Sequence, residues 1–210
     1  MPAILSRRAA LPRLSAAADT APGRDPLRPA TLILLVTLWI ASIGNLALWQ
    51  AMSRLPELAG ARGSAFMLAF GVGVAALTAL PLALLAWRWT LKPVLILCLL
   101  SAAGGTYFML SYGIVIDRSM MVNVLLTDSH EARDLMSLRL LGALALLGGL
   151  PALLVWRAPL RWASPARQLL RNGGLALGAL ALALAAGGLS FQDLSATMRN
   201  HTQLRYLINP

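Results

Sequence analysis

Between residues 117 and 136, polar side chains of several chemical types recur at helical spacing. At about 100° of rotation per residue they occupy one arc of about 100°, and apolar residues fall on the opposite side. This pattern predicts an amphipathic helix over about residues 117–136, lying in a membrane interface with its polar face at headgroup depth. The polar face comprises Asn123, Thr127, His130, Glu131 and Asp134.

Two other interpretations of this face are open. An amphipathic helix commonly has an ordinary solvated face with no ligand. A metal site formed by His130, Glu131 and Asp134 is disfavoured, although His130 and Asp134 share a face, because zinc sites use three or four firm ligands. Asp128 falls about 140° from Asn123, on another face, and the pattern gives it no role.

The composition places this helix in a membrane protein. Of the 210 residues, 58% are hydrophobic and 12% are charged, whereas soluble domains have roughly 25% charged residues. The apolar residues form runs of about 20, long enough to cross ~30 Å of hydrocarbon, where only helices satisfy their own backbone groups. We therefore predict an all-α membrane protein with five transmembrane helices, at about residues 30–52, 64–87, 93–116, 138–156 and 169–189.

The segments around the spans complete the predicted organisation. Residues 1–28 are predicted to be a disordered basic cytoplasmic tail, because they lack any sustained periodicity. Residues 29–191 form the transmembrane domain, and residues 192–210 a juxtamembrane segment. Small residues allow membrane helices to approach closely, which indicates packing sites at three glycine pairs, Gly104–Gly105, Gly148–Gly149 and Gly187–Gly188.

The net charge of +10 does not indicate nucleic-acid binding, because the basic residues form no single patch with interleaved aromatic residues. They lie in the short segments between the apolar runs. The tail and the second and fourth connections hold eleven of them, and the opposite side holds seven. Because basic residues of short loops stay cytoplasmic, we expect a cytoplasmic N-terminus and a periplasmic C-terminus in a bacterial inner membrane. Four tryptophans also lie near the predicted cytoplasmic ends, as interfacial anchors do: Trp87, Trp89, Trp156 and Trp162.

Two segments carry recognisable motifs, IDRSMMVNVLLTDSHEARDL at residues 116–135 and MRNHTQLRYLINP at residues 198–210. Both resemble segments of the lipid A phosphoethanolamine transferases, a family that includes the mobile colistin-resistance enzymes. The loop between helices three and four has a family pattern close to N-x-x-x-T-D-x-x-E-A-x-D-L. The segment Met198–Pro210 (MRNHTQLRYLINP) resembles the stretch that leads from the fifth helix into the family's catalytic domain. The loop residues that match the pattern are Asn123, Thr127, Asp128, Glu131, Ala132, Asp134 and Leu135.

The resemblance implies a function. Family members transfer phosphoethanolamine from phosphatidylethanolamine to lipid A, through a covalent phospho-threonine in a zinc-dependent, sulfatase-like periplasmic domain. That domain would follow Pro210, so we expect no catalytic residue, no metal ligand and no cofactor in this chain, with zinc implied for the catalytic domain only, and we expect the chain alone to be inactive. The resemblance also implies that Asn123, Thr127 and Glu131 contact the headgroup of the donor lipid.

A small polytopic transporter or channel subunit is the alternative function. It is disfavoured because no predicted span carries a charged residue at mid-membrane, as ion pathways usually do.

Overall fold

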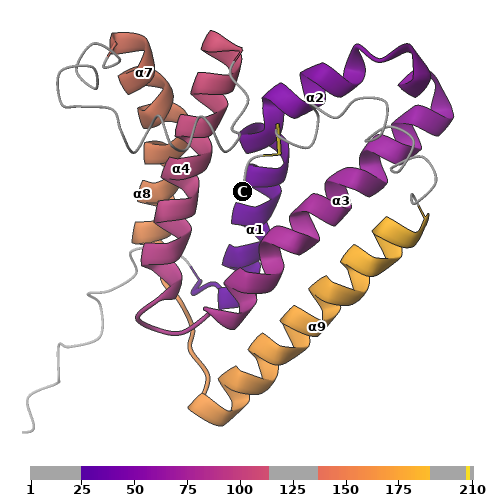
Figure 1. The fold of residues 1–210 in the computed structure, drawn as a ribbon. Coiled ribbons are helices and arrows are strands. Elements are labelled where there is room, and N and C mark those ends of the chain that lie inside the picture. Colours follow the sequence, from indigo (N-terminus) through magenta and orange to yellow (C-terminus); the bar gives the residue numbers. More distant parts are fainter. Residues whose placement is uncertain (1–24, 114–136, 190–206, 209–210) are drawn as a thin grey trace, which may run out of the picture.

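A computed structural model of the chain describes residues 25–113, 137–189 and 207–208. Every element of regular structure in this part of the chain is helical (Figure 1). The main helices are α1 (Pro29–Ser42), α2 (Leu46–Ser53), α3 (Ala61–Leu84), α4 (Leu91–Tyr112), α7 (Leu138–Ala143), α8 (Leu150–Arg157) and α9 (Pro165–Leu189). Shorter elements are the 3₁₀ turns η1 (Ile43–Asn45) and η2 (Pro56–Leu58) and the π-helical η3 (Leu144–Gly149).

The five predicted spans are confirmed as five helical stretches that are long and apolar enough to cross a membrane. Their ends lie within about five residues of the predicted ends, because the apolar runs and their flanking charges limit both. The third span ends at Tyr112, earlier than predicted, because Gly113 closes it in the left-handed conformation with φ of 63°. The stretches are Pro29–Ser53, Ala61–Leu84, Leu91–Tyr112, Leu138–Arg157 and Pro165–Gly188.

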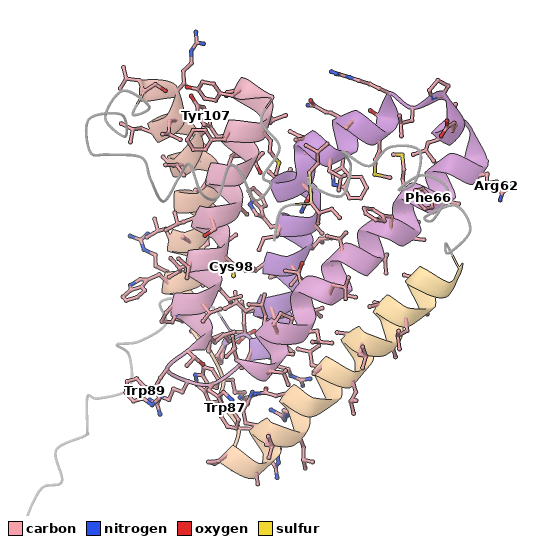
Figure 2. The ribbon with its side chains drawn as sticks, viewed as in Figure 1. Arg62, Phe66, Trp87, Trp89, Cys98 and Tyr107 are labelled. Carbon is pink, nitrogen blue, oxygen red and sulfur yellow. The ribbon has the colours of Figure 1, made fainter. Side chains whose placement is uncertain are left out.

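The helices alternate in direction, so the bundle has two distinct ends. Trp87 and Trp89 mark one of them, here called the Trp end (Figure 2). Here α1 begins, α3 leads into α4, and α8 leads into α9. The other end, here called the loop end, carries Tyr107 (Figure 2) and the residues on either side of the segment 114–136.

Helix α1 is the centre of the packing. Its side chains Ile33 and Ile40 are fully buried, and it packs against both α3 and α4. Helix α9 lies along α3 for much of its length, and α4 packs on η3 and α8 (Figure 1). The main core therefore joins α1, α3 and α4 with residues of α8 and α9, and Leu95 and Leu99 of α4 are buried in it.

The chain is already fixed just before α1. The N–H of Leu27 donates to the Pro159 carbonyl and its carbonyl accepts from the N–H of Arg161, both at 2.9 Å. Leu27, near the end of the predicted tail, is therefore hydrogen-bonded through its backbone to the connection between α8 and α9. Residues 1–24 lie outside the described part of the chain.

The first span is interrupted at residues 43–45, where η1 separates α1 from α2. Asn45, which is fully buried, donates from its side-chain nitrogen to the Ile40 carbonyl at 2.9 Å. The Thr106 hydroxyl of α4 lies 2.7 Å from the Gly44 carbonyl oxygen and 2.8 Å from that of Ala102. Backbone oxygens at the break thus find partners inside the bundle, as hydrocarbon requires.

The fourth span contains the π-helical turn η3, and neighbouring helices stabilise it. Trp39 of α1 donates from its indole nitrogen to the Leu147 carbonyl at 3.1 Å. Gly148 faces α4 so closely that an added Cβ would lie 3.0 Å from the Ala103 Cβ and 3.2 Å from the Leu99 carbonyl oxygen. The predicted packing role is confirmed for Gly148.

The other glycine pairs differ from this one. A Cβ on Gly104 would make only an ordinary contact, 3.9 Å from a Leu144 methyl group. Among the described residues, a Cβ on Gly187 or Gly188 would meet nothing within 4 Å, so no packing contact for this pair is found in this part of the chain. Small residues permit close packing only at positions that face a neighbouring helix.

The contact at Gly148 gives the first prediction. Gly148→Leu should lower the free energy of unfolding by about 1–3 kcal/mol, because the added atoms press on the backbone of α4. Gly142→Leu is the matched control in the same span, where a Cβ meets nothing within 4 Å. Thermal unfolding in detergent, followed by reaction of a thiol-specific fluorophore with Cys98, the single cysteine, measures both. Equal midpoints for the two variants would contradict the close packing.

Candidate functional site

The predicted binding residues Asn123, Thr127 and Glu131 lie outside the described residues, as do the predicted interfacial helix and His130, Asp134 and His201. Their roles stay predictions. The described residues show where the segment that carries them begins and ends. Gly113 and Ser137, which flank it, both lie at the loop end.

Both flanks are held by hydrogen bonds. Gly113 closes α4 through its N–H, which donates to the Met109 carbonyl at 3.1 Å. Ser137 caps α7, since its hydroxyl oxygen accepts from the Leu140 N–H at 3.1 Å, a contact that satisfies an otherwise unpaired amide of the first turn. The Tyr107 hydroxyl lies 3.1 Å from the same Ser137 oxygen. The end of α4 and the start of α7 are thereby joined.

Aromatic rings surround this junction. Tyr107 meets Phe108 and Tyr112 edge to face, with ring centroids 5.5 and 6.2 Å apart. Phe108 and Tyr112 stack at 5.8 Å. Aromatic side chains with a polar tip are typical of the membrane–water boundary. These rings therefore fit the interface beside the segment 114–136.

A second apolar cluster at the loop end joins α2, η2 and α3. Leu48, Met52 and Phe66 are buried in it, and Phe70 stacks on Phe66 with centroids 6.0 Å apart. Leu207 and Ile208, the described residues of the segment Met198–Pro210, pack against this cluster. The chain after α9 therefore returns to the bundle at the loop end.

The described residues do not fit a metal site. No three His, Cys, Asp or Glu side chains come together among residues 25–113, 137–189 and 207–208. Asp25 precedes α1 at the Trp end, Glu57 lies in η2 at the loop end, and Cys98 lies within α4. These groups are too far apart along the bundle to share one ion, so we derive no step through zinc for this part of the chain.

A buried polar pair at the Trp end was not predicted. Gln168 and Asn172 of α9 are each 4% exposed. The side-chain nitrogen of Asn172 donates to the Ala86 carbonyl at 2.9 Å, and that of Gln168 donates to the Asn172 side-chain oxygen at 2.8 Å. Ala86 follows the end of α3, so the pair fixes α9 to α3. The i, i+4 spacing of two amides in an apolar helix was the available signal.

The described part of the chain is thus a multi-pass helical membrane domain with a structured loop end. Residues 74–210 match the family described as phosphoethanolamine transferase EptA/EptB. The chain belongs to this family and corresponds to its N-terminal membrane domain.

Individual relatives agree with this assignment. The chain is 32% identical over 187 residues to phosphatidylethanolamine transferase Mcr-2 of Escherichia coli and 31% identical over 188 residues to Mcr-1 of the same species. Each match covers 89% of this chain and 34% of the relative, so the chain spans about a third of the length of these relatives.

A solved structure shares the fold. It is the integral membrane lipooligosaccharide phosphoethanolamine transferase A (EptA) from Neisseria meningitidis. The match has a TM-score of 0.80 at 24% identity and covers 88% of this chain and 34% of that protein. At this identity the likeness establishes the five-helix fold alone.

The Ser137 junction gives the second prediction. Ser137→Ala should destabilise the first turn of α7 by about 0.5–2 kcal/mol, which would raise amide exchange there about two- to thirtyfold. Tyr107→Phe should act less, because it leaves the cap in place. Ser137→Thr keeps the hydroxyl and should restore protection. Hydrogen exchange of the α7 peptide, read by mass spectrometry, checks the series; unchanged exchange in Ser137→Ala would contradict the cap.

Proposed function

We propose that this chain is the membrane-anchoring and donor-lipid-binding domain of a phosphoethanolamine transferase that modifies lipid A at the outer leaflet of the bacterial inner membrane. The observation that carries the proposal is the family match over residues 74–210, which includes Asn123, Thr127 and Glu131. The related Mcr-2 and Mcr-1 are named phosphatidylethanolamine transferases, which supports that phospholipid as the donor.

The proposed orientation places the Trp end in the cytoplasm and the loop end in the periplasm. Among the described residues, seven basic side chains belong to the Trp end and three to the loop end. This bias, together with Trp87 and Trp89, supports a cytoplasmic Trp end. The basic residues of the Trp end are Arg28, Arg88, Lys92, Arg157, Arg161, Arg167 and Arg171, and those of the loop end are Arg54, Arg62 and Arg139.

The proposed binding chemistry uses three groups on one helical face. The Asn123 amide and the Thr127 hydroxyl can donate to phosphate oxygens, and the Glu131 carboxylate can accept from the ethanolamine ammonium. Offsets of four and eight residues keep the three within about 80° on a helix, so one headgroup can contact all of them. Their flanking residues, Gly113 and Ser137, lie at the proposed periplasmic end.

The transfer reaction itself is proposed to use the two thirds of the relatives that this chain does not span. In that scheme the domain described here extracts or orients the donor lipid, and a zinc-dependent catalytic domain accepts the phosphoethanolamine group. The transporter alternative gains no support, because the charged residues of the described spans lie within two turns of a span end and not at mid-membrane, where ion pathways place them.

The third prediction tests the orientation. A reporter enzyme that is active only in the periplasm should be active when fused after Pro210 and inactive when fused after Trp162. A fusion after Trp89, also at the Trp end, should be inactive as well. The reverse activities would overturn the orientation and, with it, access of the loop end to outer-leaflet lipids.

The fourth prediction tests the headgroup contacts. Glu131→Gln should reduce donor use about ten- to a hundredfold, because a hydrogen bond to a charged group contributes about 1.5–3 kcal/mol. Asn123→Ala and Thr127→Ala should also reduce it. Transfer from a fluorescent phosphatidylethanolamine in proteoliposomes, with this domain joined to the catalytic part of Mcr-2, measures the effect.

The control for this series is Asp128→Asn, because Asp128 falls on another helical face. It should retain donor use close to that of the parent fusion. If Glu131→Gln, Asn123→Ala and Thr127→Ala all match the parent, the polar face is an ordinary solvated surface and the proposed headgroup site is wrong.

A further inference from the structure

An apolar cavity of about 510 Å³ lies between α3, α4 and α9. Its size falls within the range of about 300–1,000 Å³ that ligand sites usually have. Cys98 lines it from α4 (Figure 2), Gly187 lines it from α9, and Ile208 lines it as well. Three candidate membrane spans therefore line one space, and Ile208, beyond α9, also contributes to the lining.

The cavity is long and narrow. Its lining on α3 runs from Ala69 to Leu85 along one helical face, which corresponds to about 24 Å at ~1.5 Å per residue. Half of a hydrocarbon core of ~30 Å is about 15 Å, the depth that the acyl chain of one leaflet reaches. The cavity is therefore long enough for one acyl chain that enters from one side of the bilayer.

The chemistry of the lining is that of hydrocarbon. None of the lining residues is charged. The hydroxyl of Thr78, the most polar of them, donates to the Val74 carbonyl within its own helix at 2.9 Å. A polar ligand would lose its hydrogen bonds to water here without replacement. The lining therefore selects an apolar chain.

The cavity is also open to lipid. Leu77 lines it, yet 62% of the Leu77 surface is exposed, so the space opens sideways at the depth of the spans. Among the described residues, a Cβ on Gly187 would meet nothing within 4 Å, so the cavity has room for added atoms beside Gly187. Figure 1 shows α3 leaning away from α4 between the Trp end and the loop end.

We propose that this cavity binds one acyl chain of an outer-leaflet phospholipid. The cavity supports acyl-chain binding by itself, and the identification of that phospholipid as the donor rests on the proposed function. Phe70 and Ile208 line the cavity and also belong to the apolar cluster at the loop end. The cavity therefore extends from Leu85 and Val94 near the Trp end to the cluster at the loop end. We assign entry of the acyl chain to the loop end, where Gly113 and Ser137 flank the proposed headgroup residues.

Photo-crosslinking tests the proposal. The whole chain is reconstituted with phosphatidylethanolamine that carries a diazirine in one acyl chain, and labelled peptides are mapped by mass spectrometry. Labels should concentrate on the cavity-lining parts of α3, α4 and α9. Even labelling of all lipid-facing helices would overturn the proposal. So would labelling concentrated in the second cavity of about 480 Å³, which is lined by Trp39, Leu154 and Pro159.

Two pairs of variants make the test specific. Gly187→Leu fills the cavity, whereas Gly188→Leu, its exposed neighbour, does not line it. Cys98→Trp fills it from α4, and Leu97→Trp, 65% exposed outside the cavity, is the control. Each filling variant should reduce cavity labelling at least about fivefold relative to its control, with equal thermal stability within the pair. Equal labelling within both pairs would overturn the proposal.

A second lipid separates this proposal from the proposed function. Phosphatidylglycerol with the same diazirine chain should also label the cavity, and filling variants should block that labelling too. Equal labelling by both lipids supports the acyl-chain site and counts against headgroup selection. Absence of cavity labelling by either lipid overturns the acyl-chain site and leaves the headgroup residues to be judged by transfer rates.

Discussion

In hydrocarbon, a backbone carbonyl without a hydrogen bond inside its helix cannot bond to water instead, and leaving it unpaired costs several kcal/mol. The packing of this domain depends on such carbonyls at breaks and ends of its helices. Thr106 reaches Gly44 at the break in the first span, and Trp39 reaches Leu147 in the π-helical turn. At the Trp end, Asn172 bonds the Ala86 carbonyl and Lys92 that of Trp156 at 2.7 Å. Each bond joins elements distant in sequence, so satisfaction of the backbone also fixes the helix arrangement.

This constraint explains how a bundle with so much small and aliphatic surface adopts one arrangement. Between apolar helices in lipid there is little hydrophobic driving force, so close packing and interhelical hydrogen bonds must supply specificity. Gly148 supplies the close contact with α4. Around Gly187, where the described residues make no such close contact, a cavity remains between α9, α3 and α4. We propose that this space accepts a lipid chain, which would give the gap beside Gly187 a functional use.

The sequence predicts the five spans well because long apolar runs have few alternatives in a membrane. It predicts their irregularities poorly. Gly44 and Asn45 mark the first irregularity, and Pro151, which has no N–H to donate to the Leu147 carbonyl, marks the second. These residues do not reveal which type of turn forms, because the partners Thr106 and Trp39 are distant in sequence. The i, i+4 spacing of Gln168 and Asn172 indicates a polar pair on α9, but it does not indicate that the Ala86 carbonyl is the partner of that pair. Asn123, Thr127 and Glu131 remain predictions, since they rest on a motif and lie outside the described residues.

If this membrane domain itself binds the donor lipid, that lipid should stay with the domain when it is extracted from the membrane. The chain can be extracted with its surrounding lipid from a membrane of known composition and purified without exchange. Quantitative lipid mass spectrometry then compares retained phosphatidylethanolamine and phosphatidylglycerol with the parent membrane. The account predicts enrichment of phosphatidylethanolamine in the retained pool. A retained pool with the composition of the bulk membrane would contradict it.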